Sequence, residues 1–162
     1  MTIAFGHGLA ASPIQFMQSI TNVLTEHHLP LSLLKNPDRP QSTEGELIAG
    51  KDRKTLCGLM LKTLEDGTAR KAKVQGYLIG GKTGTAEKVE KGRYLKDGRN
   101  LTSFFGVFPL DNPEYLVFVS LDEPQAIQGT YGFTAAGWNA APLGGRIITR
   151  IAPMLGVEPR FE

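Results

Sequence analysis

The chain has 162 residues, of which 41% are hydrophobic and 21% are charged, and its formal net charge is +2. This length is typical of one domain, and the composition is that of a globular protein rather than a disordered or fibrous one. The small charge lacks the basic excess of nucleic-acid-binding domains, so we expect no nucleic-acid partner. No run approaches the ~18 apolar residues of a membrane span, and the single cysteine, Cys57, cannot form a disulfide within the chain.

Three stretches have apolar residues at the spacing of an amphipathic helix, namely 12–27, 53–65 and 141–155. The first begins with Ser12 and Pro13, residue types preferred at the cap and first turn of a helix, and we expect it to end near His27. The second is followed by Gly67 as a stop signal. Its apolar stripe consists of Leu56, Leu59, Met60 and Leu64. Three prolines within 29–44 predict an extended surface loop.

Beyond Val74 the pattern changes to β-favouring runs, and we predict strands over about 76–86, 102–109 and 114–122. Only the short turn 109–113 joins the last two runs. They must pair antiparallel, because a parallel return needs a crossover of about a dozen residues or more. The sequence therefore predicts an α+β fold in which helices cover an antiparallel sheet.

The most informative segment is GKTGTA at 81–86. Lys-Thr-Gly, together with Ser-x-x-Lys and a Ser-x-Asn motif, is the signature of serine β-lactamases and penicillin-binding proteins. The tripeptide alone is weak evidence, because chance supplies it often. The chain contains no Ser-x-Asn. The interpretation of 81–86 therefore depends on the motifs around it.

Further motifs frame this segment: GTA at 67–69, Tyr94, SFFG at 103–106, DEP at 122–124, YG at 131–132 and AP at 141–142. With 81–86 they resemble the class B penicillin-binding proteins along nearly the whole chain. The run GFTAAGWNAAP at 132–142 is similar to the septal, division-specific branch. The resemblance implies part of the transpeptidase fold that these enzymes share with serine β-lactamases.

The resemblance also implies roles for single residues in serine acyl transfer. Lys82 would supply a positive field, and the hydroxyls of Thr83 and Thr85 would bind the carboxylate of a D-Ala-D-Ala stem peptide or of a β-lactam. The backbone N–H of Thr85 would form one arm of an oxyanion hole, a donor aimed at the developing negative charge. Gly84 would let the substrate lie close to the strand. Neither metal nor cofactor is expected.

By the same resemblance, residues 1–162 form the C-terminal portion of a transpeptidase domain whose nucleophile-bearing half, with two further strands, lies outside the chain. The complete enzyme would be a peptidoglycan D,D-transpeptidase of cell division, anchored in the bacterial inner membrane and facing the periplasm. Its partners would be stem peptides, β-lactam antibiotics, the rest of its own domain and divisome membrane proteins. The 162 residues alone would be soluble and inactive.

A P-loop NTPase is the first alternative, because GYLIGGKT at 76–83 satisfies G-x-x-x-x-G-K-[ST]. A P-loop requires a helix that opens at Lys-Thr so that its N–H groups meet phosphate. Gly84 follows Lys-Thr directly, and the acidic residue Asp122 ends a strand of an antiparallel hairpin, whereas P-loop cores are parallel. The sequence therefore favours the transpeptidase interpretation.

The segment SLLK at 32–35 imitates another motif, because it fits Ser-x-x-Lys. Flanking prolines predict a loop there, whereas the nucleophile and its lysine must share one helical turn. A non-catalytic divisome interaction module is the remaining alternative, with the basic loop 88–99 as its surface. The three histidines lack the paired spacing and third ligand that zinc requires: His7, His27 and His28.

Overall fold

A computed structural model describes residues 10–25, 27–28, 43–45, 47–95 and 97–161. The chain forms two compact units, residues 1–53 and 54–162. None of the helices in the described part is long and apolar enough to cross a membrane.

In the first unit, helix α1 (Pro13–Leu24) begins where the sequence predicted. Ser12 caps it: the Ser12 hydroxyl accepts from the N–H of Gln15, and the Gln15 side chain reaches back to the Ser12 backbone. This reciprocal capping box satisfies donors that the first turn leaves unpaired. The predicted end near His27 is wrong by three residues, because Thr25 is already extended (φ −108°, ψ 166°).

The first unit also contains two short strands. β1 (His27–His28) pairs antiparallel with β2 (Thr43–Glu44). The predicted loop over 29–44 is therefore wrong for its last two residues, while 29–42 lie outside the described residues. The SLLK segment at 32–35 and His7 also lie outside them.

Helix α2 (Gly50–Glu65) starts three residues before the predicted position, and the second unit begins within it. Met60 and Leu64 are buried as the stripe predicted, whereas Leu59 is 57% exposed. The apolar face of α2 is therefore narrower than the sequence indicated. The 3₁₀-helix η2 (Arg70–Ala72) follows the helix.

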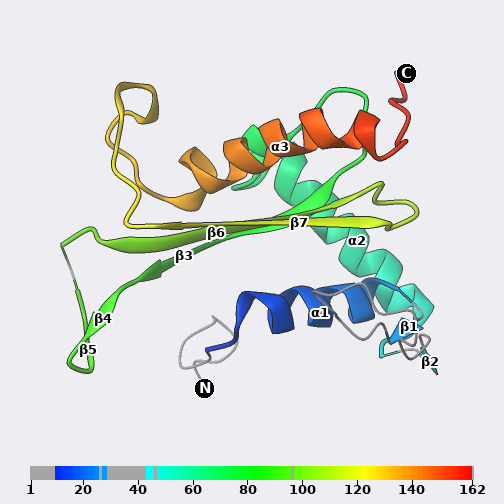
Figure 1. The fold of residues 1–162 in the computed structure, drawn as a ribbon, viewed down its shortest axis with the longest axis horizontal. Helices are drawn as coiled ribbons and strands as arrows, with labels where there is room; N and C mark the ends of the chain where they lie inside the picture. The colour runs from blue at the N-terminus through cyan, green and yellow to red at the C-terminus, as the bar shows by residue number, and fades with distance from the viewer. Residues whose placement is uncertain (1–9, 26, 29–42, 46, 96, 162) are drawn as a thin grey trace. The chain divides into compact units, whose positions relative to one another are not determined.

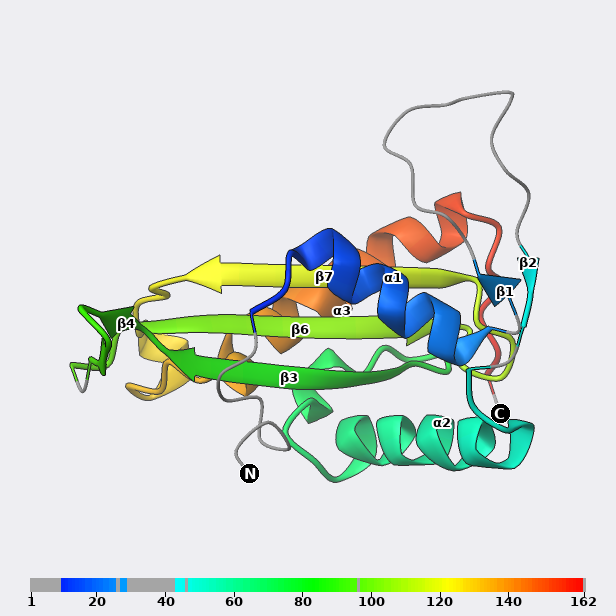
Figure 2. The same cartoon turned by 90° about the horizontal axis from the view of Figure 1, so that it is seen from below.

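The sheet of the second unit has three antiparallel strands in the order β3, β6, β7 (Figures 1 and 2). They span Gly80–Glu87, Asn100–Phe108 and Tyr115–Asp122. Position 83 pairs with Phe104, and Phe104 pairs with Val119. The last two strands match the prediction within two residues. The first begins at Gly80 rather than at 76, because Gly76 adopts a left-handed turn (φ +83°).

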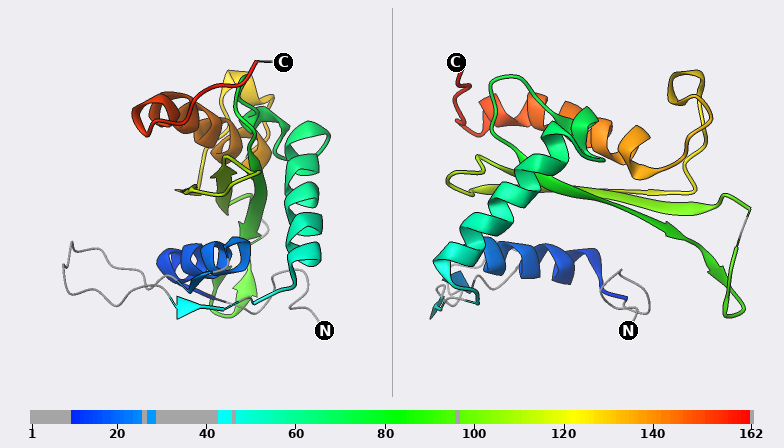
Figure 3. Two further views of the ribbon diagram at one scale, coloured as in Figure 1. Left: turned by 90° about the vertical axis from the view of Figure 1, so that its right-hand side faces the viewer. Right: turned by 180° about the vertical axis from the view of Figure 1, so that it is seen from behind.

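Helix α3 (Ala140–Met154) lies along one face of this sheet (Figures 1 and 3). The core between them contains the fully buried side chains of Phe104, Phe108 and Ile148. A Cβ at Gly144 would lie 2.4 Å from the Phe104 ring, so glycine sets the close approach of helix and strand. The predicted α+β fold, with helices covering an antiparallel sheet, is confirmed.

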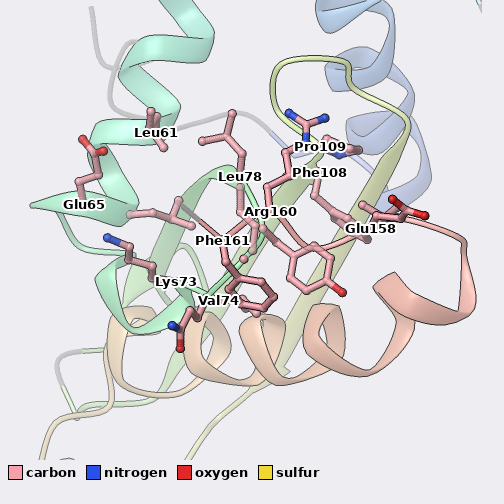
Figure 4. A pocket seen from close by; sticks show the side chains of 16 residues that line it. Leu61, Glu65, Lys73, Val74, Leu78, Phe108, Pro109, Glu158, Arg160 and Phe161 are labelled. Carbon is pink, nitrogen blue, oxygen red and sulfur yellow. The ribbon is translucent and has the colours of Figure 1, made fainter.

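The second unit contains a cavity of about 510 Å³ between α2, residues 73–79 and the C-terminal tail (Figure 4). Leu78, Lys73 and Phe161 are among the residues that line it. The tail is held there because the Arg160 N–H donates to the Gly76 carbonyl at 2.7 Å. This cavity contains none of the predicted site residues.

Candidate active site

The GKTGTA segment lies on β3, which pairs with β6 along one edge and has no partner strand on its other edge within the described sheet. Two backbone carbonyls of β3 accept hydrogen bonds from side chains. The hydroxyl of Thr63 on α2 donates to the Gly81 carbonyl, and Lys82 Nζ donates to the Thr83 carbonyl at 2.6 Å. Some backbone groups of β3 are therefore bonded to side chains rather than to β6.

Thr83 and Thr85 lie on the same face of β3, because side chains two residues apart in a strand share a face. The Thr83 hydroxyl lies 2.6 Å from that of Thr68, which follows α2. Thr85 Oγ1 accepts from the backbone N–H of Ala136 at 3.0 Å. Because Thr85 accepts this bond, its own O–H remains a donor.

These hydroxyls line a cavity of about 430 Å³. Its lining residues are Asp66, Gly67, Thr68, Arg70, Lys71, Thr83, Thr85, Ala135, Gly137 and Trp138. Of the predicted site residues, the structure brings Thr83 and Thr85 together here. Lys82 and Gly84 alternate with them along the strand and do not line the cavity. We call this cavity the threonine pocket.

Gly84 has a packing role within the sheet. A Cβ at this position would lie 2.7 Å from Ser103 Oγ on β6, so a larger residue would force the hydroxyl aside. The close approach of the Ser103 side chain therefore favours a small residue at position 84.

Thr68 and Lys71 are among the lining residues that sequence reasoning did not select as site residues. Thr68 belongs to the GTA motif that contributed to the resemblance. Nothing in the sequence indicated that its hydroxyl forms a hydrogen bond with that of Thr83, fifteen residues later. Lys71 lies on η2, with its ammonium 4.2 Å from the centre of the Trp138 ring. A dense run of basic residues at 70–73 was the available signal, and a solvated face was the simpler explanation.

Trp138 is the centre of an aromatic cluster beside the pocket. The Phe133 ring stacks on it at 5.1 Å with an interplanar angle of 14°, and Tyr131 meets it edge-on at 5.8 Å. Tyr131 itself is 79% exposed and has a left-handed backbone (φ 52°). The cluster therefore packs Trp138 while leaving Tyr131 open to solvent.

The basic loop that suggested an interaction module carries paired charges. Lys88 Nζ forms ion pairs with Asp122 at 2.7 Å and Glu123 at 2.8 Å, and these bonds, Asp122 first, raise the pKa of Lys88. Arg99 pairs with Asp97 at 2.7 Å, which lowers the pKa of that carboxyl. Two of its basic residues are therefore neutralised locally, and the loop carries less free positive charge than the sequence indicated.

The P-loop alternative is wrong. Lys82 and Thr83 lie in the middle of β3 rather than at the start of a helix, and the sheet is antiparallel throughout. No helix N-terminus is available at this motif to bind phosphate. Among the described residues, no group of histidine, cysteine or carboxylate side chains could hold a metal ion.

A covered antiparallel sheet with Lys-Thr-Gly on its outer strand is the arrangement of the penicillin-binding protein and serine β-lactamase class. The model of the family described as penicillin binding protein transpeptidase domain matches residues 1–143. The chain belongs to this family. It is 35% identical to a probable peptidoglycan D,D-transpeptidase FtsI of Caulobacter vibrioides, over 98% of this chain and 28% of that protein.

Solved structures agree with the family. The apo transpeptidase domain of penicillin-binding protein 3 from Burkholderia pseudomallei superposes with a TM-score of 0.83 at 28% identity, over 99% of this chain and 47% of that one. Penicillin-binding protein 3 of Mycobacterium tuberculosis complexed with aztreonam gives a TM-score of 0.62 at 25% identity, over 75% and 28% of the two chains. The 162 residues thus span less than half of each of these relatives.

Proposed function

We propose that this chain forms one wall of the active site of a peptidoglycan D,D-transpeptidase that works by serine acyl transfer. The observation that carries the proposal is the position of Lys-Thr-Gly-Thr on the outer strand β3, with the hydroxyls of Thr83 and Thr85 in one pocket. Two hydroxyl donors on a rigid strand suit a carboxylate, such as that of a stem peptide ending in D-Ala-D-Ala or of a β-lactam.

The alternation of backbone groups between the two edges of β3 supports a role for the Thr85 backbone. The carbonyls of Gly81 and Thr83 both accept side-chain hydrogen bonds, and the backbone groups of every second residue in a strand face the same edge. Thr85 lies two residues after Thr83, so we infer that its N–H also faces the outer edge of β3. An oxyanion hole needs such a preorganised backbone donor.

Lys82 would act from the other side of the strand. Its ammonium donates to the Thr83 carbonyl, so it is held beside the outer edge rather than inside the threonine pocket. A fixed positive charge there would stabilise the negative charge that develops in acyl transfer. We therefore assign Lys82 to electrostatic stabilisation, and Thr83 and Thr85 to substrate binding.

The rest of the reaction needs groups from outside these 162 residues. Acyl transfer requires a serine nucleophile with a base within reach, and no serine is among the described residues that line the threonine pocket. We infer that another part of the same transpeptidase domain supplies both, and that the complete protein is a membrane-anchored enzyme of the periplasm that acts with division proteins. The mycobacterial relative is complexed with aztreonam, and we infer that β-lactams would bind the complete protein as well.

The test compares the 162-residue chain with a protein in which these residues complete a full transpeptidase domain. Both are incubated with a fluorescent penicillin and analysed by mass spectrometry. The complete domain should gain one covalent adduct, and the chain alone should keep its unmodified mass. Absence of an adduct on the folded complete domain would contradict the proposed function, and an adduct on Ser32 would overturn the assignment of the nucleophile to another segment.

A further inference from the structure

The threonine pocket holds two cations that the Lys-Thr-Gly motif does not provide. Its charged lining residues are Asp66, Arg70 and Lys71, which together carry a net charge of +1, and Lys82 is absent from the lining. Both cations that line the cavity with the two threonines therefore come from η2. If the pocket binds an anion, η2 is the element that supplies the charge.

Lys71 is held in place at both ends. Its ammonium lies 4.2 Å from the centre of the Trp138 ring, and Phe133 stacks on the same indole at 5.1 Å. Its backbone belongs to η2, which packs tightly on α3: a Cβ at Gly145 would lie 2.9 Å from the carbonyl of Ala72. A cation fixed in this way loses little conformational freedom when it binds a ligand.

The hydroxyls beside it have protons to donate. Thr68 and Thr83 share one hydrogen bond of 2.6 Å, which uses one of their two protons and leaves the other for a ligand. Thr85 accepts from the Ala136 N–H and so keeps its own proton as well. Two O–H donors and the Lys71 side chain thus line the same pocket, a combination that matches the acceptor oxygens of a carboxylate.

We propose that Lys71, positioned by Trp138, is the cation that binds the substrate carboxylate in the threonine pocket, and that Lys82 acts at the outer edge of β3 instead. This inference rests on the proposed function for the identity of the carboxylate, which belongs to the terminal D-alanine of the stem peptide or to the β-lactam. It assigns carboxylate recognition and transition-state stabilisation to two different lysines.

The kinetic test uses a complete transpeptidase domain that carries these residues. Lys71→Met removes the charge, and Lys71→Arg keeps it. The matched control is Lys73→Met, because Lys73 lies two residues away but lines the other cavity. The rate of acylation is measured with benzylpenicillin and with its methyl ester, whose carboxylate is blocked. A charge-assisted contact at an exposed site predicts about a tenfold slower acylation by benzylpenicillin in Lys71→Met.

Lys71→Arg should recover most of that rate, and the control should behave as the wild type. The ester should react slowly with the wild type and lose no further rate in Lys71→Met. An equal loss for both ligands would mean that Lys71 only maintains the structure, and no loss for either would mean that it does not bind the carboxylate. Either result overturns the inference.

A binding experiment separates this inference from the proposed function, because it needs no acylation. The 162-residue chain is titrated with N-acetyl-D-alanyl-D-alanine and with the corresponding C-terminal amide, while the amide resonances of Thr83 and Thr85 are followed by NMR. We expect shifts with the free acid that are lost in Lys71→Met and absent with the amide. Equal shifts with both peptides, or with both proteins, would contradict the role of Lys71 even in an enzyme that acylates normally.

Discussion

Thr102 is completely buried on β6, directly opposite Thr85 of the threonine pocket, and its hydroxyl finds no hydrogen-bond partner among the described residues. A buried hydroxyl without a partner costs about 1–3 kcal/mol of stability. Valine has nearly the same shape and no hydroxyl. We therefore expect Thr102→Val to raise the free energy of unfolding by roughly 1 kcal/mol and the melting temperature by about 2–4 °C.

Thr130 is the matched control, because it is also buried but its hydroxyl is satisfied. Its hydroxyl accepts from the Ile127 N–H at 3.0 Å, and its O–H donates to the Ile127 carbonyl at 3.0 Å. Thr130→Val should therefore lower the free energy of unfolding by about 1–2 kcal/mol. Urea and thermal denaturation followed by circular dichroism measure both variants. If Thr102→Val is destabilised like Thr130→Val, the Thr102 hydroxyl has a partner and the reasoning from its isolation fails.

Three further predictions concern the C-terminal tail, the edge strand β7 and the core. The Arg160 hydrogen bond lowers the pKa of Asp111, so the stability from this pair is present above the ordinary carboxyl pKa and lost as the pH falls through the lowered one; the protection of the Arg160 amide, taken relative to its intrinsic exchange rate at each pH, should therefore decrease on acidification, and in Asp111→Asn should not depend on this titration. β7 (Tyr115–Asp122) has an unpaired outer edge within the described sheet, so light scattering should show association that increases with protein concentration, and a monodisperse monomer at high concentration would contradict this. Gly144→Ala should cost about 1–3 kcal/mol by overpacking Phe104, and unchanged urea unfolding would refute that contact.

The sequence predicted most of the sheet because its signals are local. The strands 100–108 and 115–122 are β-favouring runs, and they are joined by a turn too short for any other pairing. The first strand was predicted four residues too long at its start. The apolar run 77–79 has the composition of a strand, but its backbone contacts come from distant parts of the sequence. The Leu78 carbonyl accepts from the Leu110 N–H, and the carbonyl of the preceding Gly76 accepts from the N–H of Arg160 in the C-terminal tail. Such long-range contacts have no periodic signal.

Some residues of the candidate site could be identified from the sequence and others could not. Thr83 and Thr85 could be selected from the sequence because they belong to a compact motif on one strand. Thr68 and Lys71 could not, because each reaches the pocket through a partner on another element, the Thr83 hydroxyl and the Trp138 ring. The face of Lys82 could have been derived from the sequence, because 81–86 was predicted as a strand and side chains alternate between the two faces of a strand.

The rate of penicillin acylation after Lys82→Ala tests the central claim most directly. In a complete transpeptidase domain, loss of a fixed charge beside the developing oxyanion should slow acylation by about a hundredfold, equivalent to roughly 3 kcal/mol. Lys91→Ala is the control, because Lys91 lies in the exposed turn of the β4–β5 hairpin (Val89–Glu90 and Arg93–Tyr94) that follows β3. The account predicts a hundredfold loss for the first variant and none for the second. A folded Lys82→Ala domain that acylates at the wild-type rate would contradict the assignment of the active site to β3.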